Sequence, residues 1–99
     1  MMNITKTVEG EKLTVALEGR LDTLTAPELE ESLSSALEGI KELVLDLSGL
    51  EYLSSAGLRI LLASQKKMTE KGGMKVTNVN DVIMEIFEIT GFSDILTIE

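Results

Sequence analysis

The sequence contains no cysteine and no histidine, and these two absences remove most of the side chains on which small enzymes depend. Without histidine the chain has no common general base, no Ser-His-Asp triad and no imidazole ligand for a transition metal. Without cysteine it has no thiolate nucleophile, no disulfide and no thiolate zinc site. We therefore expect a protein that is not an enzyme, with no catalytic residue, no metal site and no cofactor.

Aromatic residues and cations are also scarce. Three aromatic residues leave no stacking platform for bases, and nine basic against 17 acidic residues give a net charge of -8, which repels phosphate backbones and anionic membrane surfaces. The N-terminus lacks the pattern of a signal peptide, and no apolar run reaches membrane-spanning length. We expect no nucleic-acid partner, no direct membrane insertion and a cytoplasmic location.

What the chain does contain is the material for one small domain over residues 1–99. An apolar fraction of 43% is enough for a single core. Alternating segments at 4–8 and 13–17, joined by a turn, predict a hairpin with one buried face. The apolar run at 43–47 is typical of a strand covered by helices on both faces. Further short strands are expected at 74–77 and 95–98.

Three helices are predicted between these strands. Thr25 and Glu28 have the spacing of a capping box, and Pro27 suits a first turn. The apolar stripe of this helix consists of Leu29, Leu33, Ala36, Leu37 and Ile40. The second helix, 56–71, is expected to be buried in its first half and to end at Gly72-Gly73.

The third helix is expected to begin at Asn80 and to end at Gly91. Its predicted stripe consists of Val82, Ile83, Ile86 and Phe87. The order of elements predicts an α/β fold, with helices packed on a mixed sheet of four to five strands. Exposed Ile95, Leu96 and Ile98 would allow a homodimer.

The stretch 44–59, with Leu53-Ser54-Ser55-Ala56-Gly57-Leu58-Arg59 at its end, resembles the signature of STAS domains, and most of all that of bacterial anti-sigma-factor antagonists. The early Gly19-x-Leu21-Asp22, the Pro-bearing helix and Gly72-Gly73 occur in the family's order. The resemblance implies the STAS fold and a phosphorylation switch. In such proteins the unphosphorylated antagonist binds an anti-sigma factor and frees the sigma factor; the anti-sigma factor, a serine kinase, phosphorylates the antagonist, and a PP2C-type phosphatase resets it.

The resemblance assigns the phosphorylated residue to Ser55. Ser54 is the alternative, because it stands where the family often has an aspartate. A phosphate at a helix start lies beside unpaired N–H groups, and it adds about -1.5 to -2 charges that a partner interface would have to accept. The partner-binding residues that the resemblance implies are Leu21, Asp22, Thr23, Leu53, Ser54, Ser55, Ala56, Gly57, Leu58 and Arg59.

Simpler interpretations of the same residues stay open. One serine can be a helix N-cap and the other solvated, and Asp22 can be a turn residue bonded to its own backbone. Asp46 can be a strand acid bonded to loop amides, and Arg59 either a snorkelling side chain or a partner contact. An esterase is disfavoured, because the G-x-S-x-G elbow lacks its first glycine and no histidine is present.

The main alternative function is a STAS subunit of a lipid ABC transporter or signalling scaffold that is never phosphorylated. A third hypothesis, binding of a nucleotide or other small ligand by the domain itself, has only the family analogy in its favour, since no Walker-type loop occurs.

Overall fold

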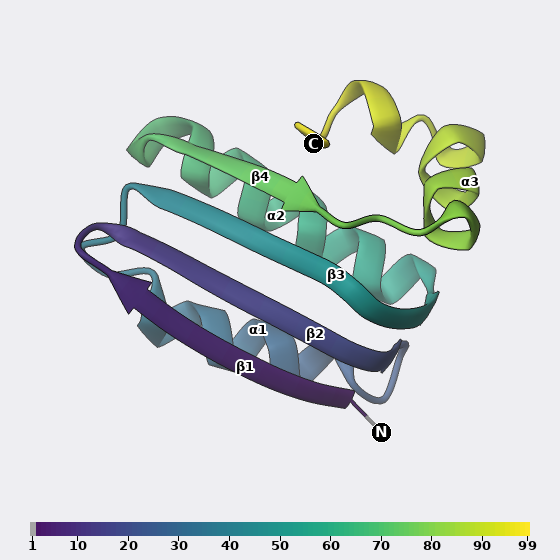
Figure 1. The fold of residues 1–99 in the computed structure, drawn as a ribbon, viewed down its shortest axis with the longest axis horizontal. Helices are drawn as coiled ribbons and strands as arrows, with labels where there is room; N and C mark the ends of the chain where they lie inside the picture. The colour runs from purple at the N-terminus through teal and green to yellow at the C-terminus, as the bar shows by residue number, and fades with distance from the viewer. Residues whose placement is uncertain (1) are drawn as a thin grey trace.

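The computed structural model describes residues 2–99 and shows a four-stranded mixed sheet with α1 and α2 on one of its faces (Figure 1). The elements in chain order are β1 (Met2–Glu9), β2 (Lys12–Leu21), α1 (Ala26–Ala36), β3 (Glu42–Leu53), α2 (Ser55–Lys71), β4 (Gly73–Thr77), α3 (Asp81–Thr90) and the 3-10 turn η1 (Phe92–Asp94). The strand order is β1-β2-β3-β4, with β1 antiparallel to β2 and the other neighbours parallel. The predicted α/β class and mixed sheet are confirmed, and Met1 of the predicted domain lies outside the described residues.

The N-terminal hairpin is confirmed. β1 and β2 pair without interruption from Met2↔Gly19 to Glu9↔Lys12, and Gly10 supplies the positive φ of +64° in the turn. Every second residue of β2 from 13 to 17 is fully or almost fully buried, as a strand period of two requires for one core face.

The prediction that strand 43–47 is covered on both faces is wrong. Leu43, Leu45 and Leu47 are fully buried, but the intervening Val44 and Asp46 are only half-buried. The reason is visible in Figure 1, where α1 and α2 lie behind the same face of the sheet. The run is therefore an alternating strand whose second face happens to carry one valine.

β3 is longer than predicted, and two irregularities in its pairing with β2 keep the leucines of its second half on the core face. Its register with β2 shifts between Ala16 and Glu18 and again between Gly19 and Arg20. Leu47, Leu50 and Leu53, spaced by three residues rather than two, are all buried as a result.

The Asp46 carboxylate stabilises the first irregularity. It accepts hydrogen bonds from the backbone N–H of Ser48 (3.0 Å) and from the Asn78 amide (3.1 Å). The Ser48 N–H, followed by the Asn78 amide, holds the pKa of Asp46 below its ordinary value. Asp46 is therefore a strand acid bonded to a backbone N–H of its own strand and to the loop residue Asn78.

Helix α1 is shorter than the predicted stripe and begins differently. Leu29 and Leu33 are buried within it, and Pro27 lies in the first turn. The helix ends at half-buried Ala36, so Leu37 and Ile40 are buried as predicted but lie beyond it. The predicted capping box is wrong: Thr25 has a helical backbone, and its side chain bonds no amide of the helix start. Its hydroxyl serves the preceding loop instead.

The burial of α2 runs along its whole length, so the prediction of a buried first half and a solvated second half is wrong. Leu61 and Met68 are fully buried, whereas Ala63 between them is exposed. Lys71, in the last turn, donates a hydrogen bond to the Leu37 carbonyl at the end of α1. The helix ends at Gly72, as predicted, where a Cβ would clash with the Lys41 carbonyl oxygen.

The third helix has the predicted ends. The Asn80 side chain accepts from the Ile83 N–H (2.9 Å), and Gly91 adopts φ +82°. Ile83 and Phe87 are fully buried, but Val82, which was expected in the same stripe, is 60% exposed.

The predicted terminal strand at 95–98 is reduced to one bridge, between Val76 and Ile98, so the sheet has four strands, within the predicted range of four to five. Leu96 is buried and Ile98 half-buried, while Ile95 is 47% exposed. The exposed apolar strip expected there does not form. The homodimer stays a prediction without that support.

Candidate functional site

The predicted site lies at the end of the sheet where β2 and β3 finish. Leu21 and Leu53 are register partners at this end, and the Ser54 N–H donates a hydrogen bond to the Leu21 carbonyl (2.9 Å). The loop 22–25 leaves β2 here, and α2 begins two residues after β3 ends (Figure 1). Carboxyl ends of adjacent parallel strands are where open α/β sheets place functional loops.

The two serines have different environments. Ser54 is the half-buried N-cap of α2, with an extended backbone and a hydroxyl that accepts from the Gly57 N–H at 3.4 Å. Ser55 is the first residue of the helix, is exposed, and makes no side-chain hydrogen bond within residues 2–99. One serine is thus a cap and the other is accessible to a modifying enzyme.

Gly57 sets how closely α2 can approach the sheet. A Cβ at this position would lie 2.7 Å from Leu21 Cγ and 2.7 Å from Leu53 Cδ1. Both leucines are buried, so the space cannot be enlarged cheaply. The glycine of the sequence signature therefore has a packing reason that fixes the position of Ser55 above the strand ends.

The Asp22 carboxylate organises the neighbouring loop. It accepts from the backbone N–H groups of Leu24 (3.0 Å) and Thr25 (3.1 Å), and it forms an ion pair with Arg20 at 3.7 Å. The Thr25 N–H, ahead of the Leu24 N–H, the Thr25 hydroxyl and the Arg20 charge, holds the pKa of Asp22 below its ordinary value. Asp22 is therefore a turn residue bonded to the backbone of its own loop. Its carboxylate is partly exposed beside the loop that carries the two serines.

The Thr25 hydroxyl joins the two ends of this loop by hydrogen bonds. It accepts from the Asp22 N–H (2.8 Å) and donates to the Arg20 carbonyl (2.7 Å). Thr25 is buried, so these bonds satisfy groups that water does not reach.

The structure adds three residues that sequence reasoning missed. The Arg20 guanidinium lies over the Tyr52 ring, 4.3 Å from its centroid, because the two residues are register partners. Leu24 is 85% exposed at the tip of the loop. Two signals in the sequence could have indicated these residues: Tyr52 is one of only three aromatic residues, and Leu24 is an apolar residue between two threonines.

The ten predicted partner-binding residues divide by exposure. Four are buried and pack the site from within: Leu21, Leu53, Gly57 and Leu58. Thr23, Ser55 and Arg59 are exposed, and Asp22, Ser54 and Ala56 are half-buried. Only the last six present atoms to a partner.

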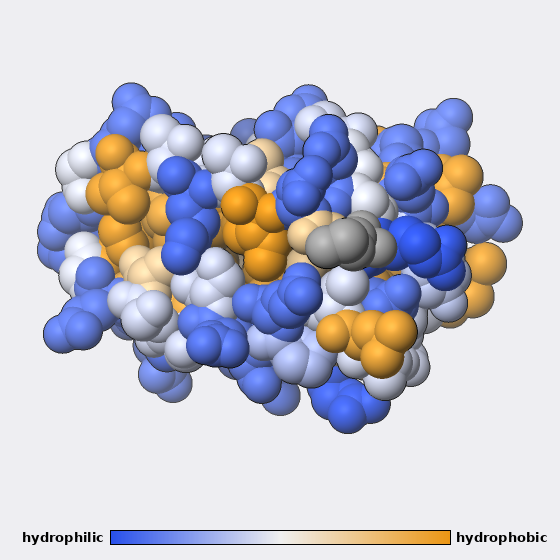
Figure 2. Space-filling model, turned by 90° about the horizontal axis from the view of Figure 1, so that it is seen from below, coloured by the Kyte–Doolittle hydropathy of each residue, from blue (hydrophilic) through white to orange (hydrophobic). Residues whose placement is uncertain are grey.

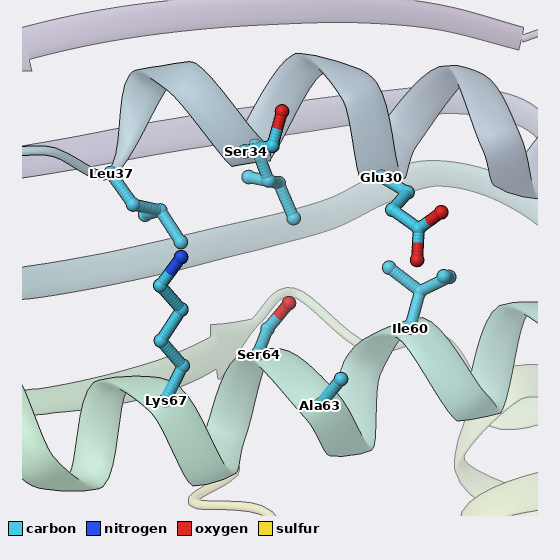
Figure 3. A pocket seen from close by; sticks show the side chains of 8 residues that line it. Glu30, Ser34, Leu37, Ile60, Ala63, Ser64 and Lys67 are labelled. Carbon is cyan, nitrogen blue, oxygen red and sulfur yellow. The ribbon is translucent and has the colours of Figure 1, made fainter.

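A cavity of about 220 Å³ separates the loop and the start of α1 from the start of α2. Its lining residues are Thr23, Ala26, Pro27, Glu30, Ala56, Arg59 and Ile60. A second, more apolar cavity of about 130 Å³ follows between α1 and α2, where Ile60 and Ala63 project toward α1 and Lys67 toward Leu37 (Figure 3).

Two further features are absent from residues 2–99. No group of three or more aspartates and glutamates is arranged to hold a metal ion. No helix in that range is long and apolar enough to cross a membrane.

Comparisons with known proteins agree on one family. The family model described as "Mlab, STAS domain" matches residues 4–97. The anti-sigma-B factor antagonist of Staphylococcus aureus is 31% identical over 97 residues, which cover 96% of this chain and 90% of that protein.

Solved structures give the same result. The crystal structure of an anti-sigma factor antagonist from Mycobacterium paratuberculosis superposes with a TM-score of 0.90 at 26% identity, over 99% of this chain and 85% of that one. SpoIIAA in its phosphorylated form, from Bacillus, shares the fold at 16% identity, with a TM-score of 0.75 over 100% of this chain and 91% of that one.

Proposed function

Because this chain belongs to the STAS domain family, we propose that it is an anti-sigma-factor antagonist whose unphosphorylated form binds an anti-sigma factor and releases a sigma factor. The partner would be a serine kinase that phosphorylates Ser55, and a PP2C-type phosphatase would reverse the modification. Both the binding and the switch would take place in the cytoplasm.

The observation that carries this proposal is the contrast between Ser54 and Ser55. Ser54 already uses its hydroxyl as an N-cap, whereas the Ser55 hydroxyl is exposed at the positive end of the α2 dipole. A phosphate on Ser55 would be tolerated by the fold, since it adds charge outside the core and near backbone N–H groups.

The same phosphate would be poorly tolerated in an interface. Exposed Thr23, Ser55 and Arg59, half-buried Asp22 and the projecting Leu24 lie around one loop pair and form the surface that we propose contacts the anti-sigma factor. Asp22 already contributes a carboxylate there, so phosphorylation would place a second anion on a surface that fits its partner when Ser55 is neutral.

The test is incubation of the chain with its cognate anti-sigma serine kinase and ATP, with the phosphate located by mass spectrometry. Wild type and Ser54→Ala should be labelled and Ser55→Ala should not. Ser55→Asp should bind the unmodified kinase more weakly than wild type. Equal labelling of Ser55→Ala, or no labelling of wild type, would contradict the switch.

A second candidate is favoured by Ser54 itself, which stands where the family often has an aspartate. If that acid is needed for phosphorylation, the chain would be a STAS subunit of a lipid ABC transporter or scaffold that is not phosphorylated. Co-purification with transporter or scaffold subunits, together with an unlabelled Ser55, would favour this candidate over the first.

A further inference from the structure

Helix α3 exposes an apolar stripe beside its buried face. Ile83 and Phe87 are fully buried, but Val82 is 60% exposed and Ile89 76% exposed, with half-buried Ile86 between them. Positions 82, 86 and 89 follow the i, i+4, i+7 spacing of one helix face. Glu85 borders this stripe, and Glu88 lies further round the exposed side of the helix. We call the stripe, together with these two glutamates, the α3 flank.

The exposure is concentrated in this region. Val82, Ile89 and Ile95 are three of the six large apolar side chains that are exposed among residues 2–99, and the other three are spread over β1, the loop after β2 and β3. On the side of the molecule that Figure 2 shows, apolar surface occurs only as separate patches between hydrophilic residues.

The charge around the α3 flank is of one sign. Residues 81–99 contain five acidic residues and no lysine or arginine. Glu85 and Glu88 form no ion pair within residues 2–99, whereas Glu99 is paired with Lys75 at 3.6 Å.

The end of α3 increases this negative potential. Its last turn holds no basic residue, so the partial negative charge of the helix C-terminus adds to that of Glu88. The end of α1 is different, because Lys71 donates a hydrogen bond to the Leu37 carbonyl there. A cation is thus supplied from within the chain at one helix end and is missing at the other.

We propose that the α3 flank is a docking surface for an amphipathic helix of a partner protein that carries lysine or arginine beside an apolar face. The stripe of Val82, Ile86 and Ile89 accepts the apolar ridge of such a helix, and Glu85 and Glu88 accept its cations. Burial of the apolar side chains would strengthen these charge pairs by excluding water from them.

The same charges exclude the other occupants. A second copy of this chain would bring carboxylates against carboxylates on two molecules that each carry a net charge of -8. Anionic lipid surfaces and nucleic acids are repelled for the same reason. Figure 1 shows α3 at the end of the molecule where α2 begins, but no part of this proposal depends on Ser55 or its phosphorylation.

The test uses the full ¹⁵N-labelled chain and two synthetic helical peptides with the same leucine face, one with lysines and one with glutamates on its polar side. The lysine peptide should shift the amide resonances of 82–90 selectively, and the glutamate peptide should leave them unchanged. Val82→Ser/Ile89→Ser should weaken binding of the lysine peptide by about tenfold or more. Val8→Ser, which removes an exposed valine on β1, should not weaken it.

Two double variants, each removing two glutamate charges, distinguish attraction of the peptide to the α3 flank from attraction to the net charge of the chain. Glu85→Gln/Glu88→Gln should weaken binding at low salt, and Glu30→Gln/Glu31→Gln, exposed on α1, should not. The proposal would be overturned if the lysine peptide shifted resonances of α1 or the sheet, or if both peptides bound equally well. It would also be overturned if the two glutamate pairs had equal effects, or if the chain self-associated and Val82→Ser/Ile89→Ser abolished that self-association. Ser55 labelling by the kinase is read separately and should be the same in the α3 variants.

Discussion

The Ser54 backbone N–H donates a hydrogen bond to the Leu21 carbonyl oxygen over 2.9 Å, and this contact ties the two loops of the site together. Leu21 precedes the Asp22 turn and Ser54 precedes Ser55, so this hydrogen bond joins the two loops at the ends of β2 and β3. The geometry of the proposed interface thus depends on how α2 is seated over Leu21 and Leu53. Packing there can be tested without a partner.

Gly57→Ala should destabilise the domain although alanine is the better helix former. Helix propensity alone would favour alanine by up to about 1 kcal/mol, but the added methyl meets Leu21 and Leu53 at 2.7 Å. Overpacking of this kind costs about 1–3 kcal/mol, so the free energy of unfolding in urea should fall. Unchanged or raised stability would show that the glycine is not needed for packing.

Thr25→Val should cost more than Thr25→Ser. Valine keeps the shape but leaves the Asp22 N–H and the Arg20 carbonyl without their partner, which costs about 1–3 kcal/mol for buried groups. Serine retains the hydroxyl and loses only a methyl group. Urea midpoints of the two variants give the comparison, and equal midpoints would contradict the role assigned to the hydroxyl.

The start of α1 is where prediction from the sequence failed most clearly. Thr25 and Glu28 have the correct spacing for a capping box, but spacing does not report backbone conformation, and Thr25 is already helical. The Asp22 carboxylate takes over by accepting from the Thr25 and Leu24 N–H groups. At Asn80 the same kind of reasoning was confirmed, because Asn80 has the extended backbone of an N-cap and its side chain accepts from the Ile83 N–H.

Strands were predicted in the correct order but with incorrect environments. Val44 made the run at 43–47 appear apolar on both faces, and only the placement of α1 and α2 on one face, a tertiary property, decides against that. The two register shifts of β3 depend on its pairing with β2, and the isolated Gly49 within the strand is a local signal for the first of them alone. The Arg20–Tyr52 contact was missed because cross-strand neighbours are not visible along one chain. The exposure of Leu24 was missed because it depends on how the loop 22–25 folds.

Acid should destabilise the domain through Asp22 and Asp46. Both carboxyl groups have a folded-state pKa below the ordinary value of an aspartate, so each favours folding above that ordinary value. This contribution is lost as the pH falls through the folded-state pKa, because the proton then binds both states equally well. Urea midpoints should therefore hold at neutral pH and decline below about pH 4.

Asp22→Asn and Asp46→Asn should each lower stability at neutral pH and flatten that decline. Glu31→Gln is the control, because its carboxylate makes no hydrogen bond or ion pair with any residue from 2 to 99. If the control flattened the acid limb as much as the two aspartate variants do, the decline would reflect general charge rather than these hydrogen bonds.

Gly72→Ala should be the most damaging glycine substitution of the chain's α2 region. A Cβ at Gly72 would clash with the Lys41 carbonyl oxygen, which belongs to the backbone leading into β3 and cannot rotate away as a side chain can. We expect a loss at the upper end of the overpacking range, about 3 kcal/mol, measured by urea or thermal unfolding. The adjacent Gly73→Ala is the matched control, because nothing lies within 4 Å of its Cβ position. Similar losses at both positions would mean that chain flexibility, rather than the approach of Lys41, accounts for the Gly72-Gly73 pair.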